Sequence, residues 1–238
     1  MDEFEGLSPL RMPTRNRPLL GLTVLAVEDS RFSCEALRLM CLRSGARIRR
    51  ADCLRAARRH LQVYRPSVAI VDLGLPDGPG VELIKELDHA TPRVEVILGV
   101  SGDDDSEARA MAAGADDFLP KPLTNLAAFQ HKILSLLPVE RQPIGPRIVS
   151  HESIDPDPIA YLDDMAHVAN LLDGQNDGAI LDYASQFLSG VARSAKDAPL
   201  ADAASELARC RKGNGAVKAH LTVVTNLIHQ RLSKRLAI

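Results

Sequence analysis

Aromatic side chains are scarce in this chain of 238 residues: they make up 3% of it, and tryptophan is absent. So few rings leave little material for the stacking platforms on which proteins bind single-stranded nucleic acid. A large charge of one sign is also lacking, because the formal net charge is −2, which gives no general attraction to DNA or anionic lipid. No apolar run is long enough to span a bilayer, and the N-terminus lacks the apolar core of a signal peptide. We therefore expect no membrane partner.

Cysteines are few and widely spaced. The chain has four, at positions 34, 41, 53 and 210, and their spacing does not fit a metal site. We interpret them as reduced, mostly packed thiols and expect a cytoplasmic protein. Hydrophobic residues make up 45% of the chain, which is enough for a sizeable core in one large domain or two small ones.

One stretch organises the first half of the chain. Residues 68–71 are four apolar residues that end at Asp72, and a turn rich in glycine and proline follows. A short apolar run closed in this way is typical of a buried strand in a parallel sheet. Because ligands of open α/β sheets bind at the carboxyl ends of the strands, Asp72 is predicted to lie at a functional site.

Strand-like and helix-like patterns alternate from Leu22 to Pro138. The predicted strands are 22–27, 46–51, 68–71, 94–100 and 117–119, and the predicted helices are 31–42, 54–64, 81–87, 107–113 and 126–137. Five such units predict a five-stranded parallel sheet with helices on both faces. We predict that residues 1–20 are a disordered arm and that the proline-rich residues 139–157 are a linker.

Several polar side chains follow the predicted strands. Glu28 and Asp29 come directly after the first strand, and Asp72 ends the third. Ser101 ends the fourth strand and Lys121 follows the fifth. Converging carboxylates repel one another unless a cation neutralises them, and hard oxygen ligands suit Mg²⁺. A carboxylate nucleophile with a metal ion, a lysine and a hydroxyl is the arrangement that phosphoryl transfer needs.

Residues 22–138 resemble the receiver domain of bacterial two-component response regulators. The resemblance depends on the polar residues above and on the run Phe118-Leu-Pro-Lys121-Pro122. The resemblance implies a flavodoxin-like fold of five strand–helix units over residues 21–138. It also implies a catalytic set and a Mg²⁺ site. In the catalytic set, Asp72 accepts the phosphoryl group and Lys121 and Ser101 bind its oxygens, while the Mg²⁺ ligands are Glu28, Asp29, Asp72 and the Gly74 carbonyl.

The same resemblance implies a switch. Ser101 and Phe118 would respond to phosphorylation of Asp72, and the peptide before Pro122 is expected to be cis. A histidine kinase or a phosphotransfer protein would supply the phosphoryl group. Receivers catalyse only their own phosphorylation and dephosphorylation, so we do not expect an enzyme in the metabolic sense.

The second half of the chain is predicted to be helical throughout. Apolar stripes at helical spacing run through residues 159–172, 180–195, 200–207 and 217–232. Four amphipathic helices with short connections predict an antiparallel four-helix bundle over residues 158–238.

Residues 183–207 resemble part of a histidine phosphotransfer (HPt) domain. That family carries an exposed histidine, with a lysine three residues later and then a glycine. In this chain Gly190 fits, but Gln186 takes the place of the histidine and Ser189 that of the lysine. Gln186 and Ser189 are predicted to share the outer face of their helix, opposite its apolar stripe. Glutamine has no nucleophilic imidazole, so we expect no phosphorelay here. We expect instead that the helical domain is an output that binds other signalling proteins or forms a homodimer. The alternative to the HPt resemblance is an unrelated four-helix bundle.

A competing interpretation concerns the C-terminal end. Residues 206–221 are somewhat similar to the helix-turn-helix of LuxR-type regulators, with Lys218 placed near DNA phosphates. The turn is one residue short, and residues 190–200 are too long for the turn that would precede it. DNA is therefore not the expected partner, and a DNA-binding transcriptional regulator is the alternative function.

Overall fold

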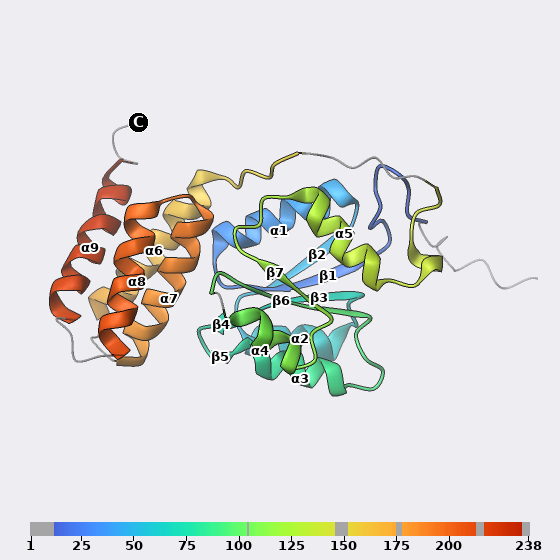
Figure 1. The fold of residues 1–238 in the computed structure, drawn as a ribbon, viewed down its shortest axis with the longest axis horizontal. Helices are drawn as coiled ribbons and strands as arrows, with labels where there is room; N and C mark the ends of the chain where they lie inside the picture. The colour runs from blue at the N-terminus through green and yellow to red at the C-terminus, as the bar shows by residue number, and fades with distance from the viewer. Residues whose placement is uncertain (1–11, 104, 146–151, 175–177, 213–216, 235–238) are drawn as a thin grey trace, which may run out of the picture.

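An α/β region and a helical region make up the described chain (Figure 1). A computed structural model describes residues 12–103, 105–145, 152–174, 178–212 and 217–234. The α/β region precedes residue 146, and the helical region begins at residue 158.

A parallel sheet with the strand order β2–β1–β3–β6–β7 is the centre of the α/β region. Its strands are β1 (Thr23–Val27), β2 (Arg47–Ala51), β3 (Val68–Asp72), β6 (Val96–Ser101) and β7 (Asp117–Pro120). The helices are α1 (Arg31–Ser44), α2 (Leu54–Val63), α3 (Gly80–His89), α4 (Ser106–Ala112) and α5 (Leu126–Leu136). The predicted five-stranded parallel sheet is confirmed. Strand order reverses at β1 and β3, which is where ligands bind in such sheets.

Two apolar layers hold the helices on the sheet. Alternate residues of a strand point to opposite faces, so Val24 packs with α1 and α5 whereas Leu25 packs with α2 and α3. Figure 1 shows α1 and α5 on one face of the sheet and α2, α3 and α4 on the other. Each face is therefore covered, as the near-continuous apolar runs of the central strands require.

A small hairpin after β3 was not predicted. Strands β4 (Gly74–Leu75) and β5 (Gly78–Pro79) pair antiparallel, with Gly74 opposite Pro79. Gly80 then starts α3 against the backbone of Asp72, where a Cβ would lie 1.9 Å from the Asp72 carbonyl oxygen. Only glycine permits this approach, so the hairpin and α3 hold the end of β3 in place.

Two boundaries predicted from the sequence need correction. The disordered arm was predicted to reach residue 20, but Leu19 is fully buried and its N–H donates to the Ser44 carbonyl; residues 1–11 lie outside the described residues. The predicted linker also contains structure: a 3-10 helix, η1 (Val139–Arg141), and the buried side chain of Ile154. Isolated apolar residues among prolines and charges give no periodic signal, which is why both were missed.

The helical region consists of α6 (Pro158–Gly174), α7 (Gly178–Ser194), α8 (Ala198–Lys212) and α9 (Val217–Lys234) in the described part of the chain. Helix α7 packs on α8, α8 on α9, α9 on α6 and α6 on α7. One apolar core unites them, with Leu188, Leu200 and Val224 fully buried. Within the described ranges, no helix combines the length and apolar composition needed to cross a membrane.

Candidate functional site

Three carboxylates gather at the carboxyl ends of β1 and β3. One oxygen each of Glu28, Asp29 and Asp72 lies within 4.8 Å of the others. Glu28 and Asp72 are buried, with 1% and 6% of their surfaces exposed. Parallel pairing of β1 with β3 brings these strand ends together, as the sequence predicted. A cluster made only of hard oxygen donors is the donor set that Mg²⁺ prefers.

Lys121 lies against this cluster. Its Nζ donates to Asp72 Oδ2 at 2.5 Å and lies 2.8 Å from Glu28 Oε2. Burial works against the charged amine, but the two carboxylates outweigh it and raise the pKa of Lys121 above its usual value. The lysine therefore stays protonated and neutralises part of the negative charge of the cluster.

The pKa values of the carboxylates reflect their crowding. Burial, and next the charge of Asp72, raise the pKa of Asp29 to about 7. The same two causes raise the pKa of Glu28 well above its usual value, against the opposing effect of Lys121. Both shifts mean that the site favours a bound cation, because a positive charge would stabilise the ionised carboxylates.

Ser101 and Phe118 occupy the positions that the resemblance assigned to a switch. Ser101 ends β6, and its Oγ accepts hydrogen bonds from Ser106 Oγ at 3.1 Å and from the Asp103 N–H at 3.3 Å. The Phe118 side chain is buried, 4% exposed, and lies against Gly99. The peptide between Lys121 and Pro122 is cis, as expected.

The first turn of α1 is capped by a residue of the helical region. Asp164 on α6 accepts hydrogen bonds from the Arg31 N–H at 2.8 Å, the Phe32 N–H at 3.1 Å and Ser30 Oγ at 2.7 Å. Phe32 itself packs in the apolar core of the helical region. A carboxylate at a helix N-terminus satisfies free N–H groups and the helix dipole, so α1 binds the two regions together next to the acidic cluster.

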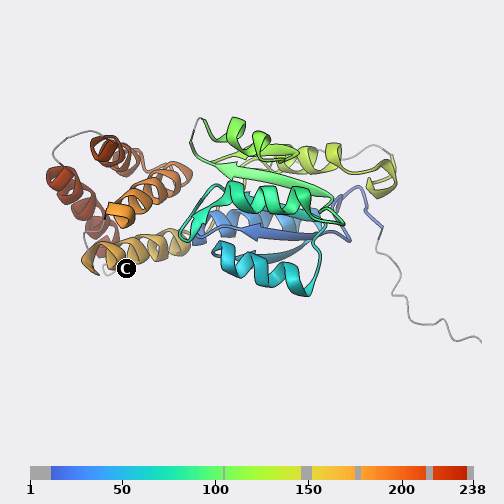
Figure 2. The same cartoon turned by 90° about the horizontal axis from the view of Figure 1, so that it is seen from below.

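Helix α7 contacts the loops that surround Asp72. The Tyr183 hydroxyl donates to Asp29 Oδ2 at 2.6 Å, and Gln186 Nε2 donates to Asp103 Oδ2 at 3.1 Å. Arg193 Nη1 donates to the Gly102 carbonyl at 2.7 Å. Figure 2 shows the helical region lying at one end of the sheet. The pocket beside Asp72 is consequently lined by residues of both regions.

The lining of that pocket contains nearly every predicted site residue. The α/β region contributes Glu28, Asp29, Ser30, Asp72, Gly74, Ser101, Gly102, Asp103 and Lys121, and α7 contributes Gln186, Phe187, Gly190 and Val191. The Gly74 N–H donates to Asp72 Oδ1 at 3.0 Å. The sequence placed the receiver residues correctly at one edge of the sheet, but it gave no sign that α7 forms the facing wall.

The residues of the HPt-like motif point to different sides of α7. Gln186 is exposed and faces the pocket, as does Gly190. Ser189 was predicted on the outer face of its helix, but only 5% of it is exposed and its Oγ hydrogen-bonds Ser205 Oγ at 3.0 Å. The prediction for Ser189 is wrong because α8 packs against that side of α7.

Residues that the sequence did not single out include Asp164, Tyr183 and Arg193. Each is an ordinary polar residue on a predicted helix, and its role depends on a partner more than 90 residues away along the chain. No local pattern marks such a contact.

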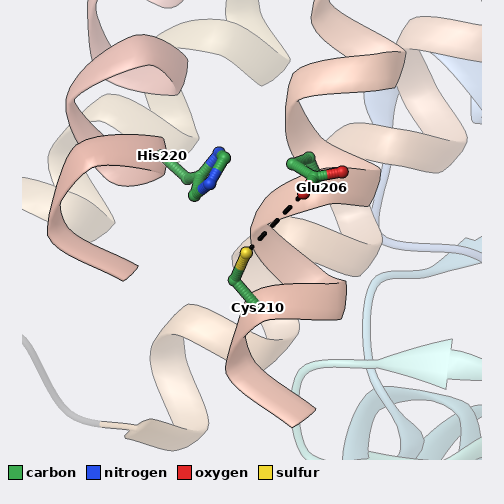
Figure 3. A group of neighbouring side chains, drawn as sticks. All are labelled: Glu206, Cys210 and His220. Carbon is green, nitrogen blue, oxygen red and sulfur yellow. Dashed lines mark hydrogen bonds between the residues drawn. The ribbon is translucent and has the colours of Figure 1, made fainter. Parts of the chain in front are cut away.

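A second group of metal-binding residue types joins α8 to α9. Figure 3 shows Glu206, Cys210 and His220, whose ligand atoms lie within 4.8 Å of one another. Cys210 Sγ lies 3.7 Å from Glu206 Oε1, and Arg209 forms an ion pair with the same glutamate. Sulfur and nitrogen donors do not suit Mg²⁺, so the acidic cluster beside Asp72 is the better magnesium site.

Comparison with known proteins agrees with this geometry. The response regulator receiver domain family matches residues 24–133, which include Glu28, Asp29, Asp72, Ser101 and Lys121. Residues 24–133 are a receiver domain. The receiver domain thus covers the five strands and the acidic cluster, and the helical region lies outside the match.

Two of the curated relatives match less than half of this chain. The KDP operon transcriptional regulatory protein KdpE of Escherichia coli is 34% identical over 99 residues, which cover 42% of this chain and 44% of KdpE. The virulence transcriptional regulatory protein PhoP of Salmonella typhimurium is 31% identical over 102 residues, covering 42% of this chain and 46% of PhoP. The match spans less than half the length of each relative.

Solved structures of receivers are also similar to this part of the chain. The signal receiver domain of a signal transduction histidine kinase from Syntrophus aciditrophicus is 26% identical, with a TM-score of 0.45. It covers 52% of this chain and 97% of that structure.

Proposed function

We propose that this chain is a response regulator whose Asp72 accepts a phosphoryl group in a Mg²⁺-dependent reaction. The observation that carries the proposal is the buried cluster in which Lys121 Nζ contacts both Asp72 Oδ2 and Glu28 Oε2. An anionic nucleophile beside a fixed cation is suited to an incoming phosphoryl group. A histidine kinase or a phosphotransfer protein would be the natural donor.

Glu28, Asp29, Asp72 and the Gly74 carbonyl are the proposed Mg²⁺ ligands. Bound there, Mg²⁺ would neutralise part of the charge that develops on the transferring phosphoryl oxygens. Lys121 would bind one of those oxygens, and Ser101 would donate a hydrogen bond to another. The protein itself is the substrate of this reaction, so we propose a regulator and not an enzyme that acts on a separate molecule.

Phosphorylation with a small phosphodonor tests this function. The full chain is incubated with acetyl phosphate and Mg²⁺, and the phosphorylated fraction is measured on a phosphate-affinity gel. We expect one Asp72-dependent phosphorylated band that Asp72→Asn removes and that chelation of Mg²⁺ prevents. Asp52→Asn is the matched control, because this exposed aspartate follows β2 outside the pocket. A band that persists in Asp72→Asn would contradict the assignment.

For the helical region we propose a four-helix bundle of the HPt type that lacks the phospho-accepting histidine and serves as the output. In support, α6 to α9 share one apolar core, and Gln186 faces the aspartate that an HPt histidine would face. Because α7 contacts the loop after β6 and also approaches Gly74 after β3, a phosphoryl group at Asp72 would change the contacts of this region. The output would be a contact with another signalling protein or a homodimer.

A pull-down of the full chain from its host lysate tests the output. The chain is used with and without beryllofluoride and Mg²⁺, which imitate phospho-Asp72. We expect a protein partner that is retained in only one of the two states, and no such difference for Asp72→Ala. Recovery of DNA fragments instead would support the alternative function.

DNA binding stands as the second candidate because KdpE and PhoP are both transcriptional regulatory proteins. Their similarity to this chain extends over 99 and 102 residues, which is 42% of it. Helices α8 and α9 pack side by side, and Val224 and Ile228 of α9 are buried. The alternative predicts salt-dependent duplex binding that weakens in Lys218→Ala, measured by gel shift.

A further inference from the structure

A carboxamide from α7 lies at the pocket beside Asp72. Gln186 Nε2 donates to Asp103 Oδ2 at 3.1 Å, and it also lies 3.1 Å from the point that a Cβ on Gly74 would occupy. Gly74 begins the β4–β5 hairpin after β3, and Asp103 belongs to the loop after β6. The amide therefore stands between the two loops that flank the phosphorylation site.

Neighbouring contacts fix this position. Tyr183, one turn before Gln186, is bonded to Asp29, and Arg193, two turns after it, is bonded to the Gly102 carbonyl. A Cβ on Gly102 would lie 3.6 Å from the Cα of Gly190, so α7 passes close to the loop after β6. Helix α7 is therefore held against the receiver domain on both sides of Gln186, and the amide itself is oriented by its hydrogen bond to Asp103.

Asp103 also determines which way the amide points. A carboxylate can only accept hydrogen bonds, so it holds the amide nitrogen and leaves Gln186 Oε1 as the acceptor. Among the described residues, no donor is hydrogen-bonded to this oxygen. Helix α7 thus contributes a hydrogen-bond acceptor to the lining of the pocket that also contains Asp72 and Lys121.

We propose that Gln186 is a catalytic residue for hydrolysis of the phosphoryl group on Asp72, so that the helical region acts as a built-in phosphatase of its own receiver domain. This inference rests on the proposed phosphorylation of Asp72. The Gln186 Oε1 accepts a hydrogen bond from a water molecule and holds it for attack on phosphorus. The substrate is the aspartyl phosphate of the same chain.

The reaction balances with water as its one co-reactant. The water oxygen forms a bond to phosphorus while the bond from phosphorus to the Asp72 carboxylate oxygen breaks. The electron pair of that bond returns to Asp72, which becomes a carboxylate again. Both protons of the water leave with the phosphate as dihydrogen phosphate. Neither Gln186 nor Asp103 changes its covalent state.

Geometry favours this role over others for the glutamine. In phosphoryl transfer, the attacking and leaving oxygens lie roughly in line, so the water must approach from the side away from Asp72. Helix α7 supplies the facing wall of the pocket, and a glutamine amide is a known means of orienting water for attack on a phosphoryl group. A histidine at this position could accept the phosphoryl group; the glutamine instead directs it to water.

The lifetime of phospho-Asp72 tests the proposal. The full chain is phosphorylated with acetyl phosphate and Mg²⁺, the donor is removed by desalting, and the loss of the phosphorylated band is followed over time. Gln186→Leu keeps the approximate size of the side chain and removes both polar atoms. We expect it to lengthen the lifetime by about tenfold or more, because an unpositioned water reacts more slowly. The matched control, Gln230→Ala on the exposed side of α9, should leave the lifetime unchanged.

A second variant separates catalysis from docking. Tyr183→Phe keeps Gln186 and removes one bond between α7 and the receiver domain. Hydrogen exchange of the Arg31 and Phe32 amides, which are bonded to Asp164, reports docking in each variant. We expect Gln186→Leu to slow hydrolysis far more than Tyr183→Phe, and we expect the Arg31 and Phe32 amides to stay protected in Gln186→Leu.

Three results would overturn the proposal. Equal or faster hydrolysis in Gln186→Leu would show that the amide does not assist the water. Equal slowing in Tyr183→Phe with the same loss of amide protection would assign the effect to docking. If the wild-type chain gains no phosphoryl group at Asp72, the proposed function fails as well. If Asp72 is phosphorylated but Gln186→Leu does not change the lifetime of the phosphoryl group, only this inference fails.

Discussion

The receiver domain and the helical region contribute to the same pocket in different ways. The receiver domain supplies side chains at strand ends, such as Asp72 at the end of β3 and Lys121 after β7, and the parallel sheet brings them together. The helical region supplies Gln186 from α7 to the pocket, and Asp164 of α6 bonds Ser30 in its lining; the partners of both side chains lie in the other region. A site built within one sheet follows from the order of its strands, whereas a site shared by two regions depends on how they dock.

The largest effect is expected within the receiver domain. Lys121→Met keeps most of the side-chain volume but leaves Asp72 and Glu28 buried without their cation. Breaking a buried ion pair in this way costs about 3–5 kcal/mol, so the free energy of unfolding in urea should fall by that order. Lys132→Met is the control: it pairs with Asp117 near the surface and should cost less than about 1 kcal/mol. Similar losses in the two variants would contradict the comparison.

A smaller effect is expected where the regions meet. Asp164→Ala removes the acceptor for two N–H groups and one hydroxyl at the start of α1. Loss of such a cap costs about 1–2 kcal/mol, and urea unfolding should show it. Faster hydrogen exchange at Arg31 and Phe32 should accompany it. Asp173→Ala, on an exposed residue near the other end of α6, should have little effect on either measurement.

Within the helical region, we predict that the ion pair between Asp197 and Arg231 makes the free energy of unfolding depend on pH. Hydrogen bonds from Arg231, against the opposing effect of burial, lower the pKa of Asp197 to about 2. A lowered pKa in the folded state stabilises the protein above the unfolded pKa of about 3.9, and this contribution is lost as the pH falls toward 2. Between pH 5 and pH 2.5 the wild type should lose about 1–2 kcal/mol more unfolding free energy than Asp197→Asn. Parallel losses in both proteins would show that the ion pair is not responsible.

The smallest effect concerns a single hydrogen bond between the regions. Tyr183→Phe removes the hydroxyl that donates to Asp29 Oδ2 and keeps the ring. One hydrogen bond to a charged acceptor contributes about 1–2 kcal/mol, and solvent that reaches the vacated carboxylate reduces the net loss to about 1 kcal/mol. Exchange of the Arg31 and Phe32 amides should accelerate slightly. Tyr64→Phe, on a residue of the receiver domain far from α7, should leave that exchange unchanged.

How far the sequence predicts this molecule depends on the same difference. The apolar runs and the residues after them predicted the five-stranded sheet, the acidic cluster and the position of Lys121, because strand ends of a parallel sheet converge by construction. Helical periodicity also predicted α6 to α9 within a few residues. The sequence could not predict the contacts of Asp164 and Tyr183 with the receiver domain, because their partners are distant along the chain and nothing local distinguishes these residues from other polar residues on a helix. Burial of Ser189 was missed for that reason.

The central claim is that the Gln186 amide faces Asp72, the proposed phosphorylation site, in the full chain. Its side-chain NH₂ signals in a ¹⁵N spectrum test this most directly, with Gln186→Leu identifying them by their loss. Addition of beryllofluoride and Mg²⁺ should shift these two signals in the wild type and leave them in place in Asp72→Asn. If backbone signals around Asp72 move while those of the Gln186 amide do not, the helical region does not cover the site and the account is wrong.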